Sequence, residues 1–316
     1  MLFRSPFWRR GKEVLLCALG QREIPLAVRV DKAQFQRYLV PVAASLHQTP
    51  KDAACTVGKD GAVLHQKGVS GVVLDTEALV DTITPALHAL RLPQRVALEP
   101  AIEAPAVTAE DLAAVDAVLG VYTTYYTSAS NRGENIEIAA ASLNRRLIRS
   151  GAAFSFNEVV GKRVPSAGYL TAPVIVDGKV EQDFGGGVCQ VSSTLYNAIL
   201  LANLTPTQRV PHFYPSTYVP AGLDATVADG QIDFCFENRL PHNVYLLTEA
   251  GDDTLTIRVL GCRADVPGEI YMETAVVGPN PTVDSYRVYE RDGVEIHREF
   301  PTTRSEERRV GKECRS

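Results

Sequence analysis

Three consecutive glycines, Gly185 to Gly187, restrict the local fold more than any other feature of the chain. Glycine loses more backbone entropy on folding than any other residue, so such a run is unfavourable inside a helix or strand. We expect a turn here, with positive φ angles or a close approach to other backbone. The run separates a predicted hairpin at 172–180, whose turn is Asp177-Gly178, from a predicted helix that follows.

The stretch after the glycines predicts a helix with two different faces. One face is apolar and consists of Val191, Leu195, Ala198 and Ala202. The other carries residues spaced at i, i+3, i+4 and i+7, namely Cys189, Ser192, Ser193 and Tyr196. Cys189 then falls in the first turn, where the positive end of the helix dipole favours a thiolate.

A thiolate at a helix N-terminus is the arrangement that many cysteine nucleophiles use. Such a nucleophile needs a general base, and the nearest downstream candidate is His212, with Asp224 as a carboxylate that orients the imidazole. The amides of the glycine loop are candidate donors to an oxyanion. The sequence therefore predicts a catalytic group of Cys189, His212 and Asp224.

Structural roles for the same residues remain open alternatives. Free cysteine is among the most buried residue types, so Cys189 also fits a small residue packed at a glycine corner. His212, between Pro211 and Pro215, equally fits a turn histidine. No paired metal-ligand spacing appears, so we predict neither a metal nor a cofactor. Structural positions are predicted for His242, Cys235 and Cys262.

The pattern along the chain predicts an α+β fold with two consecutive α+β domains and mixed or antiparallel sheets. Three prolines between 93 and 107 indicate a linker, and a helix is predicted to begin at Thr108 and to end at Gly120. The expected divisions are a first domain at 6–106, a second domain at 107–262 and a C-terminal connector at 263–303.

Composition excludes several classes of protein. The 316 residues include 45% hydrophobic and 22% charged residues, which is typical of a globular protein. The net charge of −5 provides no basic field of the kind that nucleic-acid binding requires, so no nucleic-acid partner is expected. The apolar run from Val14 to Gly20 is far shorter than the roughly 20 residues that cross a bilayer.

Both ends of the chain are interpreted as translated sequencing adapters. RSEERRVGKECRS, at 304–316, matches one reading frame of a common short-read adapter, and MLFRS, at 1–5, resembles the partner adapter end. We therefore expect an internal fragment and leave both ends out of fold reasoning. Without Cys314 the cysteine count is odd, which argues against a full disulfide framework.

Several longer motifs resemble the VanW domain. They are FSFN at 154–157, GKR at 161–163, GYLTAPVI at 168–175, FGGGVCQVSSTLYNA at 184–198 and PHFYPSTYVPAGLDATV at 211–227. Upstream, PKDAACTV at 50–57, GVVLDTEALVDTI at 71–83 and VTAEDL at 107–112 resemble a peptidoglycan-binding domain that often precedes VanW domains. Domain 6–106 is accordingly expected to be peptidoglycan-binding, and 107–262 to be VanW-like.

The resemblance implies a bacterial cell-envelope protein on the extracytoplasmic side, held by an N-terminal membrane segment that this fragment lacks. It implies an association with vancomycin resistance by name, but no known reaction. Carried over from the motif, the expected substrate-binding residues are Gly185, Gly186, Gly187, Gln190, Ser192, Ser193, Tyr196, Asn197, Tyr218 and Thr226.

Two functional hypotheses follow. The first is an accessory module that binds peptidoglycan or its precursors through both domains. The second is a cysteine acyltransferase or amidohydrolase on peptidoglycan stem peptides, in which Cys189 attacks, His212 is the base and Asp224 orients it. A Cys189 sulfur within about 4 Å of a His212 ring nitrogen, beside an open pocket, favours the enzyme, whereas a sulfur sealed in apolar packing favours the binding module.

Overall fold

The computed structural model describes residues 7–20, 29–89, 99–176, 179–212, 216–277 and 282–301. The two segments interpreted as adapters, 1–5 and 304–316, lie outside the described residues, as does the predicted Asp177-Gly178 turn. The chain divides into two compact units. The first comprises residues 1–51 and 70–104, and the second comprises 52–69 and 105–316.

The first unit is mainly helical. Its elements are α1 (Phe7–Ala18), α2 (Lys32–Leu46), α3 (Thr76–His88) and the antiparallel pair β3 (Gly71–Val73) and β4 (Ala101–Glu103). Asp75 caps α3 by accepting hydrogen bonds from two amides of its first turn. Pro85 lies inside α3 without ending it. Among the described residues, no helix has the length and apolarity required to cross a bilayer.

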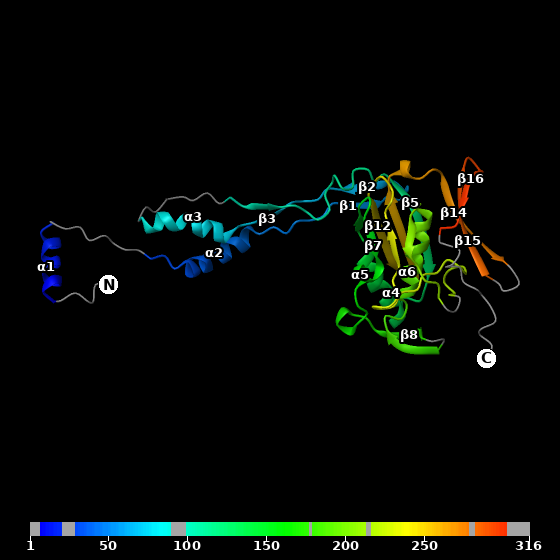
Figure 1. The fold of residues 1–316 in the computed structure, drawn as a ribbon, viewed down its shortest axis with the longest axis horizontal. Helices are drawn as coiled ribbons and strands as arrows, with labels where there is room; N and C mark the ends of the chain where they lie inside the picture. The colour runs from blue at the N-terminus through cyan, green and yellow to red at the C-terminus, as the bar shows by residue number, and fades with distance from the viewer. Residues whose placement is uncertain are drawn as a thin grey trace. The chain divides into compact units, whose positions relative to one another are not determined.

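A four-stranded antiparallel sheet is the centre of the second unit. Its order is β5 (Ala117–Tyr125), β13 (Thr254–Gly261), β12 (Val244–Gly251) and β6 (Arg146–Ile148). Helices α4 (Asn131–Leu143) and α6 (Val188–Leu201) contact each other and pack on this sheet (Figure 1). The predicted α+β class with antiparallel sheets is confirmed.

Alternate residues of β12 face two different hydrophobic cores. Val244 and Leu246 point into the larger core with α4 and α6, whereas Tyr245 and Leu247 belong to a smaller cluster with Cys55. Cys55 lies in the hairpin of β1 (Ala54–Val57) and β2 (Val63–Gln66). Both faces of the central sheet are therefore covered within the second unit, which explains why residues 52–69 group with it.

Smaller elements complete the surroundings of α6. Strands β10 (Thr205–Gln208), β11 (Cys235–Glu237) and β7 (Ala153–Ser155) form a second sheet, and β8 (Thr171–Val176) pairs with β9 (Lys179–Phe184). Short helices follow at α5 (Phe156–Val160), η2 (Pro165–Ala167) and η3 (Arg263–Asp265). All five cysteines that are described are free thiols.

The segment expected to be a connector forms a three-stranded antiparallel sheet. Its strands are β14 (Glu269–Val277), β15 (Thr282–Arg291) and β16 (Val294–Glu299). Buried Arg287 of β15 donates to the carbonyls of Leu200 at 3.3 Å and Leu204 at 2.6 Å, just where α6 ends. A guanidinium thus satisfies carbonyls at a helix C-terminus, where cations are favourable.

The prediction of a helix from Thr108 to Gly120 is wrong. Residues 109–114 form turns, and β5 begins at Ala117. The capping interaction is nevertheless present, because Thr108 and Asp111 each accept a hydrogen bond from the other's backbone amide. The domain limits of 6–106, 107–262 and 263–303 stay a prediction, and the compact units divide the chain differently.

Candidate active site

The glycine run forms the tight turn that leads into α6. Gly185 and Gly187 have φ angles of +81° and +112°, a region that favours glycine. At Gly186 φ is ordinary, but a Cβ there would lie 2.7 Å from the carbonyl oxygen of Pro173. Both reasons for which the sequence predicted glycine are therefore present: positive φ at two residues of the run, and close approach at all three.

A buried asparagine of α4 holds this turn in place. The Nδ2 of Asn135 donates to the carbonyls of Leu170 at 2.9 Å and Gly186 at 3.0 Å. Its Oδ1 accepts from the amide of Leu170 at 2.8 Å. The Asn135 side chain therefore satisfies backbone groups on two loops at once, and it has no exposed surface.

Cys189 is the second residue of α6, as the sequence predicted, and it is half-buried. As a thiol, its Sγ donates to the carbonyl of Val227 at 3.4 Å. The His212 imidazole and the Arg163 guanidinium both lower the pKa of this thiol. Cys189 thus has polar neighbours on one side and also packs against the larger hydrophobic core.

His212 is oriented by Asp224, as the catalytic hypothesis expected. The imidazole Nδ1 and the backbone N–H of His212 both lie 2.6 Å from Oδ2 of Asp224. Since Asp224 occupies Nδ1, the ring nitrogen left for the Cys189 thiol is Nε2. Arg209 binds the other carboxylate oxygen at 3.2 Å and the Asp224 carbonyl at 2.7 Å, which fixes this carboxylate from its far side.

Electrostatics at the three residues favour an ion pair between sulfur and imidazole. Burial raises the pKa of Cys189, but the His212 imidazole, the Val227 backbone and the Arg163 charge together outweigh burial and bring that pKa below its ordinary value. Burial likewise opposes the charged imidazole, yet Asp224 and Cys189 raise the pKa of His212 to about 9. Burial raises the pKa of Asp224, but the hydrogen bonds from His212 and the charges of Arg209 and His212 outweigh burial. The pKa of Asp224 is therefore lowered. A thiolate, an imidazolium and a carboxylate are thus favoured together.

Tyr218 and Ser193 complete the polar surroundings of the imidazole. The Tyr218 hydroxyl lies 3.4 Å from Nε2 of His212, and burial raises the pKa of Tyr218. Ser193 of α6 accepts from the Ala225 amide at 2.9 Å and donates to the Cys189 carbonyl at 2.7 Å. Ser193 therefore joins the first turn of α6 to the segment that carries Asp224.

Other residues predicted to bind substrate are buried and hold α6 against residues 222–226. Ser192 donates to the Ala225 carbonyl at 2.7 Å, and Asn197 donates to the Leu223 carbonyl at 2.7 Å. The ring of Tyr196 lies 5.2 Å from the Arg209 guanidinium carbon, within cation–π range. The predicted apolar and polar faces of α6 are both buried. Substrate contact by these residues, by Gln190 and by Thr226 stays a prediction.

Two arginines that the sequence analysis missed lie at the start of α6. A Cβ on Gly185 would lie 2.6 Å from Cγ of Arg163, and one on Gly187 would lie 3.0 Å from Cγ of Arg132. The charges of both guanidinium groups interact with Cys189. The glycine run was the available signal, because glycines beside a reactive residue indicate that something must approach closely.

One hollow of about 450 Å³ lies away from these residues. It is formed by α4, β12 and β13, with Glu137, Asn144 and Thr248 among its lining residues. None of its lining residues belongs to the group around Cys189. The hollow and the group formed by Cys189, His212 and Asp224 are therefore separate features of the second unit.

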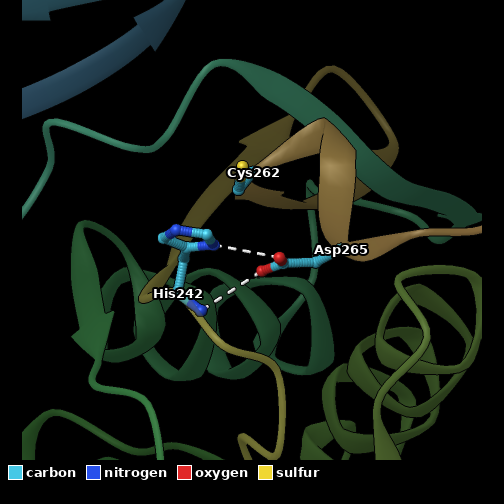
Figure 2. A group of neighbouring side chains, drawn as sticks. All are labelled: His242, Cys262 and Asp265. Atoms are coloured by element: carbon cyan, nitrogen blue, oxygen red, sulfur yellow. Dashed lines mark hydrogen bonds and ion pairs between the residues drawn. The ribbon is translucent and has the colours of Figure 1, made fainter.

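A separate group of metal-type donors comprises His242, Cys262 and Asp265. Their donor atoms lie within 4.8 Å of one another, close enough to share one ion. Figure 2 shows the ring and the backbone nitrogen of His242 both facing the Asp265 carboxylate, at 2.9 and 3.2 Å. Both carboxylate oxygens thus already have donors, so hydrogen bonding accounts for the contact between His242 and Asp265. The expectation of no bound metal stays a prediction.

Comparisons with known proteins identify two families in the chain. Residues 131–260 match the family described as "VanW like protein". Residues 4–91 match the family described as "Putative peptidoglycan binding domain". The first match contains Cys189, His212 and Asp224 together with Arg132 and Arg163. No solved structure matches the chain.

Two curated relatives match part of the chain. One is "Uncharacterized protein YoaR" of Bacillus subtilis (strain 168), which is 45% identical over 122 residues, 38% of this chain and 40% of the relative. The other is "Vancomycin B-type resistance protein VanW" of Enterococcus faecalis (strain ATCC 700802 / V583). It is 34% identical over 113 residues, 34% of this chain and 41% of the relative.

The matched segment spans less than half the length of either relative. The family matches, in contrast, cover the VanW-like motifs and the upstream motifs at 50–57 and 71–83, so the resemblance deduced from the sequence is confirmed, whereas the motif at 107–112 lies between the two matches. The chain therefore contains a VanW-like domain at residues 131–260, preceded at residues 4–91 by a segment that is similar to the family described as "Putative peptidoglycan binding domain".

Proposed function

We propose that the VanW-like domain is a cysteine-dependent acyltransferase or amidohydrolase that acts on peptidoglycan stem peptides in the bacterial cell envelope. The observation that carries the proposal is the His212 imidazole held by Asp224 at 2.6 Å, whose charge favours a thiolate at Cys189 in the first turn of α6. The peptidoglycan-type match at residues 4–91 supports the choice of substrate. The name of one relative refers to vancomycin resistance, and the proposal for this chain does not include resistance.

The proposed reaction has two steps with a thioester between them. The Cys189 thiolate attacks an amide carbonyl carbon, and the Cys189 backbone N–H stabilises the oxyanion. The neighbouring amides of Val188 and Gln190 already donate to backbone carbonyls of the glycine run. The C–N bond then breaks, and the His212 imidazolium gives its proton to the leaving amine. A second amine or water attacks the thioester, His212 takes its proton, and the thiolate is released. Asp224 keeps Nε2 directed at the sulfur throughout.

Peptidoglycan binding without chemistry is the second candidate. The match at residues 4–91 favours it, because that family is described as peptidoglycan binding. Binding and catalysis are compatible, since a binding domain raises the local concentration of wall peptides at a neighbouring active site. A binding module alone, however, requires no thiolate and no oriented imidazole.

The test combines the whole chain with soluble peptides released from peptidoglycan and follows the products by mass spectrometry. We expect shortened or newly joined stem peptides, together with a Cys189 acyl adduct when the reaction is stopped in acid. Cys189→Ser should abolish both. Cys235→Ser is the matched control, because Cys235 is also half-buried but burial and Asp233 raise its pKa to about 12.

Sedimentation with insoluble peptidoglycan distinguishes the two candidates. If Cys189→Ser sediments like the unchanged chain and neither protein alters any peptide, the chain is a binding module and the catalytic proposal fails. If the unchanged chain converts peptides and Cys189→Ser does not, the catalytic proposal stands whatever the affinity for intact peptidoglycan.

A further inference from the structure

The glycine run brings two arginine side chains against the start of α6. Gly185 leaves room for the Cβ and Cγ of Arg163, and Gly187 leaves room for the carbonyl oxygen and Cγ of Arg132. Any larger residue at either position would displace one of these side chains. The run therefore does more than form a turn, because it places two cationic side chains next to the predicted nucleophile.

The two arginines differ in how their charges are balanced. Arg163 forms an ion pair with Asp229 and also donates to Asn157 at 2.7 Å. Arg132 donates to the neutral amide of Gln190 at 2.8 Å. Among the described residues, no carboxylate lies within ion-pair distance of Arg132. A half-buried guanidinium without a carboxylate partner is unfavourable by itself; burial lowers the pKa of Arg132, and the charges of Tyr218 and Cys189 oppose that effect.

Gln190 fixes the direction of the Arg132 guanidinium. The buried Nε2 of Gln190 donates to the Tyr125 carbonyl at 2.9 Å and to the Thr124 hydroxyl at 3.0 Å. A carbonyl only accepts, so the amide nitrogen must face Tyr125 and the amide oxygen must face Arg132. Gln190 follows Cys189 directly in α6, so the helix fixes the position of the Arg132 partner relative to the nucleophile.

We propose that Arg132 binds a carboxylate of the acyl donor, so that the preferred donor is a peptide with a free carboxyl group next to the amide that Cys189 attacks. This inference rests on the proposed function, because it assigns the substrate class of the same site. The planar guanidinium can accept a carboxylate through two parallel hydrogen bonds. A free terminal carboxylate would then distinguish donor peptides from amidated or internal peptide bonds.

The test uses two small reagents of nearly equal size that alkylate the same sulfur. Iodoacetate carries a carboxylate and iodoacetamide carries a neutral amide. The rates at Cys189 are measured in the whole chain by mass spectrometry of the peptide that contains it, at constant pH and ionic strength. The ratio of the two rates isolates carboxylate recognition, because thiolate nucleophilicity affects both reagents alike.

We expect the iodoacetate-to-iodoacetamide ratio to fall about tenfold in Arg132→Gln, the size expected for loss of a charged hydrogen bond. Arg132→Lys should retain an intermediate ratio. The matched control is Arg146→Gln, which removes the same charge from an exposed side chain and should leave the ratio unchanged. An Arg132→Gln ratio equal to that of the unchanged chain overturns the proposal.

A second measurement uses only the unchanged chain, so it does not depend on how variants fold. Acetate should slow the alkylation of Cys189 by iodoacetamide in a saturable way, whereas acetamide and chloride at equal ionic strength should not. Equal effects of acetate and chloride overturn the carboxylate site while leaving the proposed function intact. A Cys189 that reacts with neither reagent in the folded chain contradicts the proposed function itself.

Discussion

A single oxygen of Asp224 accepts both the ring Nδ1–H and the backbone N–H of His212, each at 2.6 Å. Two donors from one residue fix both the position of the imidazole and its rotation. The other oxygen binds the Arg209 guanidinium, so the carboxylate itself is held on both sides. Asp224 is therefore the residue on which the geometry of the Cys189 site depends.

Replacing Asp224 with asparagine should lower the reactivity of Cys189 at neutral pH. An amide cannot stabilise the imidazolium, so the pKa of His212 should fall from about 9 and the thiolate should lose its cationic partner. We expect alkylation of Cys189 at pH 7 to slow by about tenfold or more, since a shift of one pKa unit corresponds to a factor of ten. Unaltered alkylation would show that Asp224 does not act through His212.

The same substitution should affect stability in a pH-dependent way. The folded state lowers the pKa of Asp224, so its stabilisation is complete above the unfolded pKa of about 4 and is lost as the pH falls below it. Urea unfolding should show Asp224→Asn less stable than the unchanged chain by roughly 3 kcal/mol at pH 7. That difference should shrink at pH 3. A constant difference would contradict the lowered pKa.

Alanine at Gly187 should destabilise the chain far more than alanine at Gly230. Gly187 has a φ of +112°, and a Cβ there would lie 2.9 Å from the Arg132 carbonyl oxygen. Gly230 also has a positive φ, of +67°, but nothing lies within 4 Å of its Cβ position. We expect thermal unfolding to give losses of roughly 3 kcal/mol for Gly187→Ala and about 1 kcal/mol for Gly230→Ala. Equal losses would contradict the close approach.

Asn135→Ala should weaken the turn that leads to Cys189, whereas Asn131→Ala should not. Asn135 is buried and holds both Leu170 and Gly186, but Asn131 is exposed and makes one hydrogen bond to the Thr171 carbonyl. We expect a loss of roughly 2 kcal/mol in the free energy of urea unfolding for Asn135→Ala and little change for Asn131→Ala. Similar values for both would contradict the anchoring role.

Arg287 should stabilise the attachment of the C-terminal sheet to α6. Its side chain is buried, and it bonds Glu299 at 2.5 Å as well as the carbonyls after α6. Arg287→Ala should lower the free energy of unfolding by roughly 3 kcal/mol. Arg298 forms ion pairs at the surface, so Arg298→Ala should cost at most about 1 kcal/mol. A small effect at Arg287 would mean that β14 to β16 are held by other contacts.

The α6 region could be predicted from the sequence because local rules determine it. Glycine favours positive φ, and apolar spacing after Gly187 indicates a helix, so the first-turn position of Cys189 followed directly. The order of Cys189, His212 and Asp224 in the chain indicated chemical roles. That order did not determine contact, which depends on how residues 205–212 and 216–226 pack against α6.

The features that the sequence did not predict depend on distant contacts. Thr108 and Asp111 form the expected capping interaction, but the segment between them and β5 remains a turn because Leu112 and Val115 pack into the cluster around Cys55. Arg132 belongs to a helix end that looks like ordinary polar surface in the sequence. Only the fold places it against Gly187 and Gln190.

The pH dependence of Cys189 alkylation by iodoacetamide in the unchanged chain tests the central claim most directly. The pKa of a free thiol is about 8.5. Because His212 favours the thiolate, we predict that the alkylation rate of Cys189 reaches half its maximum at a pH well below that value. Reaction should be detected at the peptide that contains Cys189 while the chain stays folded. A half-maximal rate at or above pH 8.5, or no reaction until the chain unfolds, would contradict a Cys189 nucleophile.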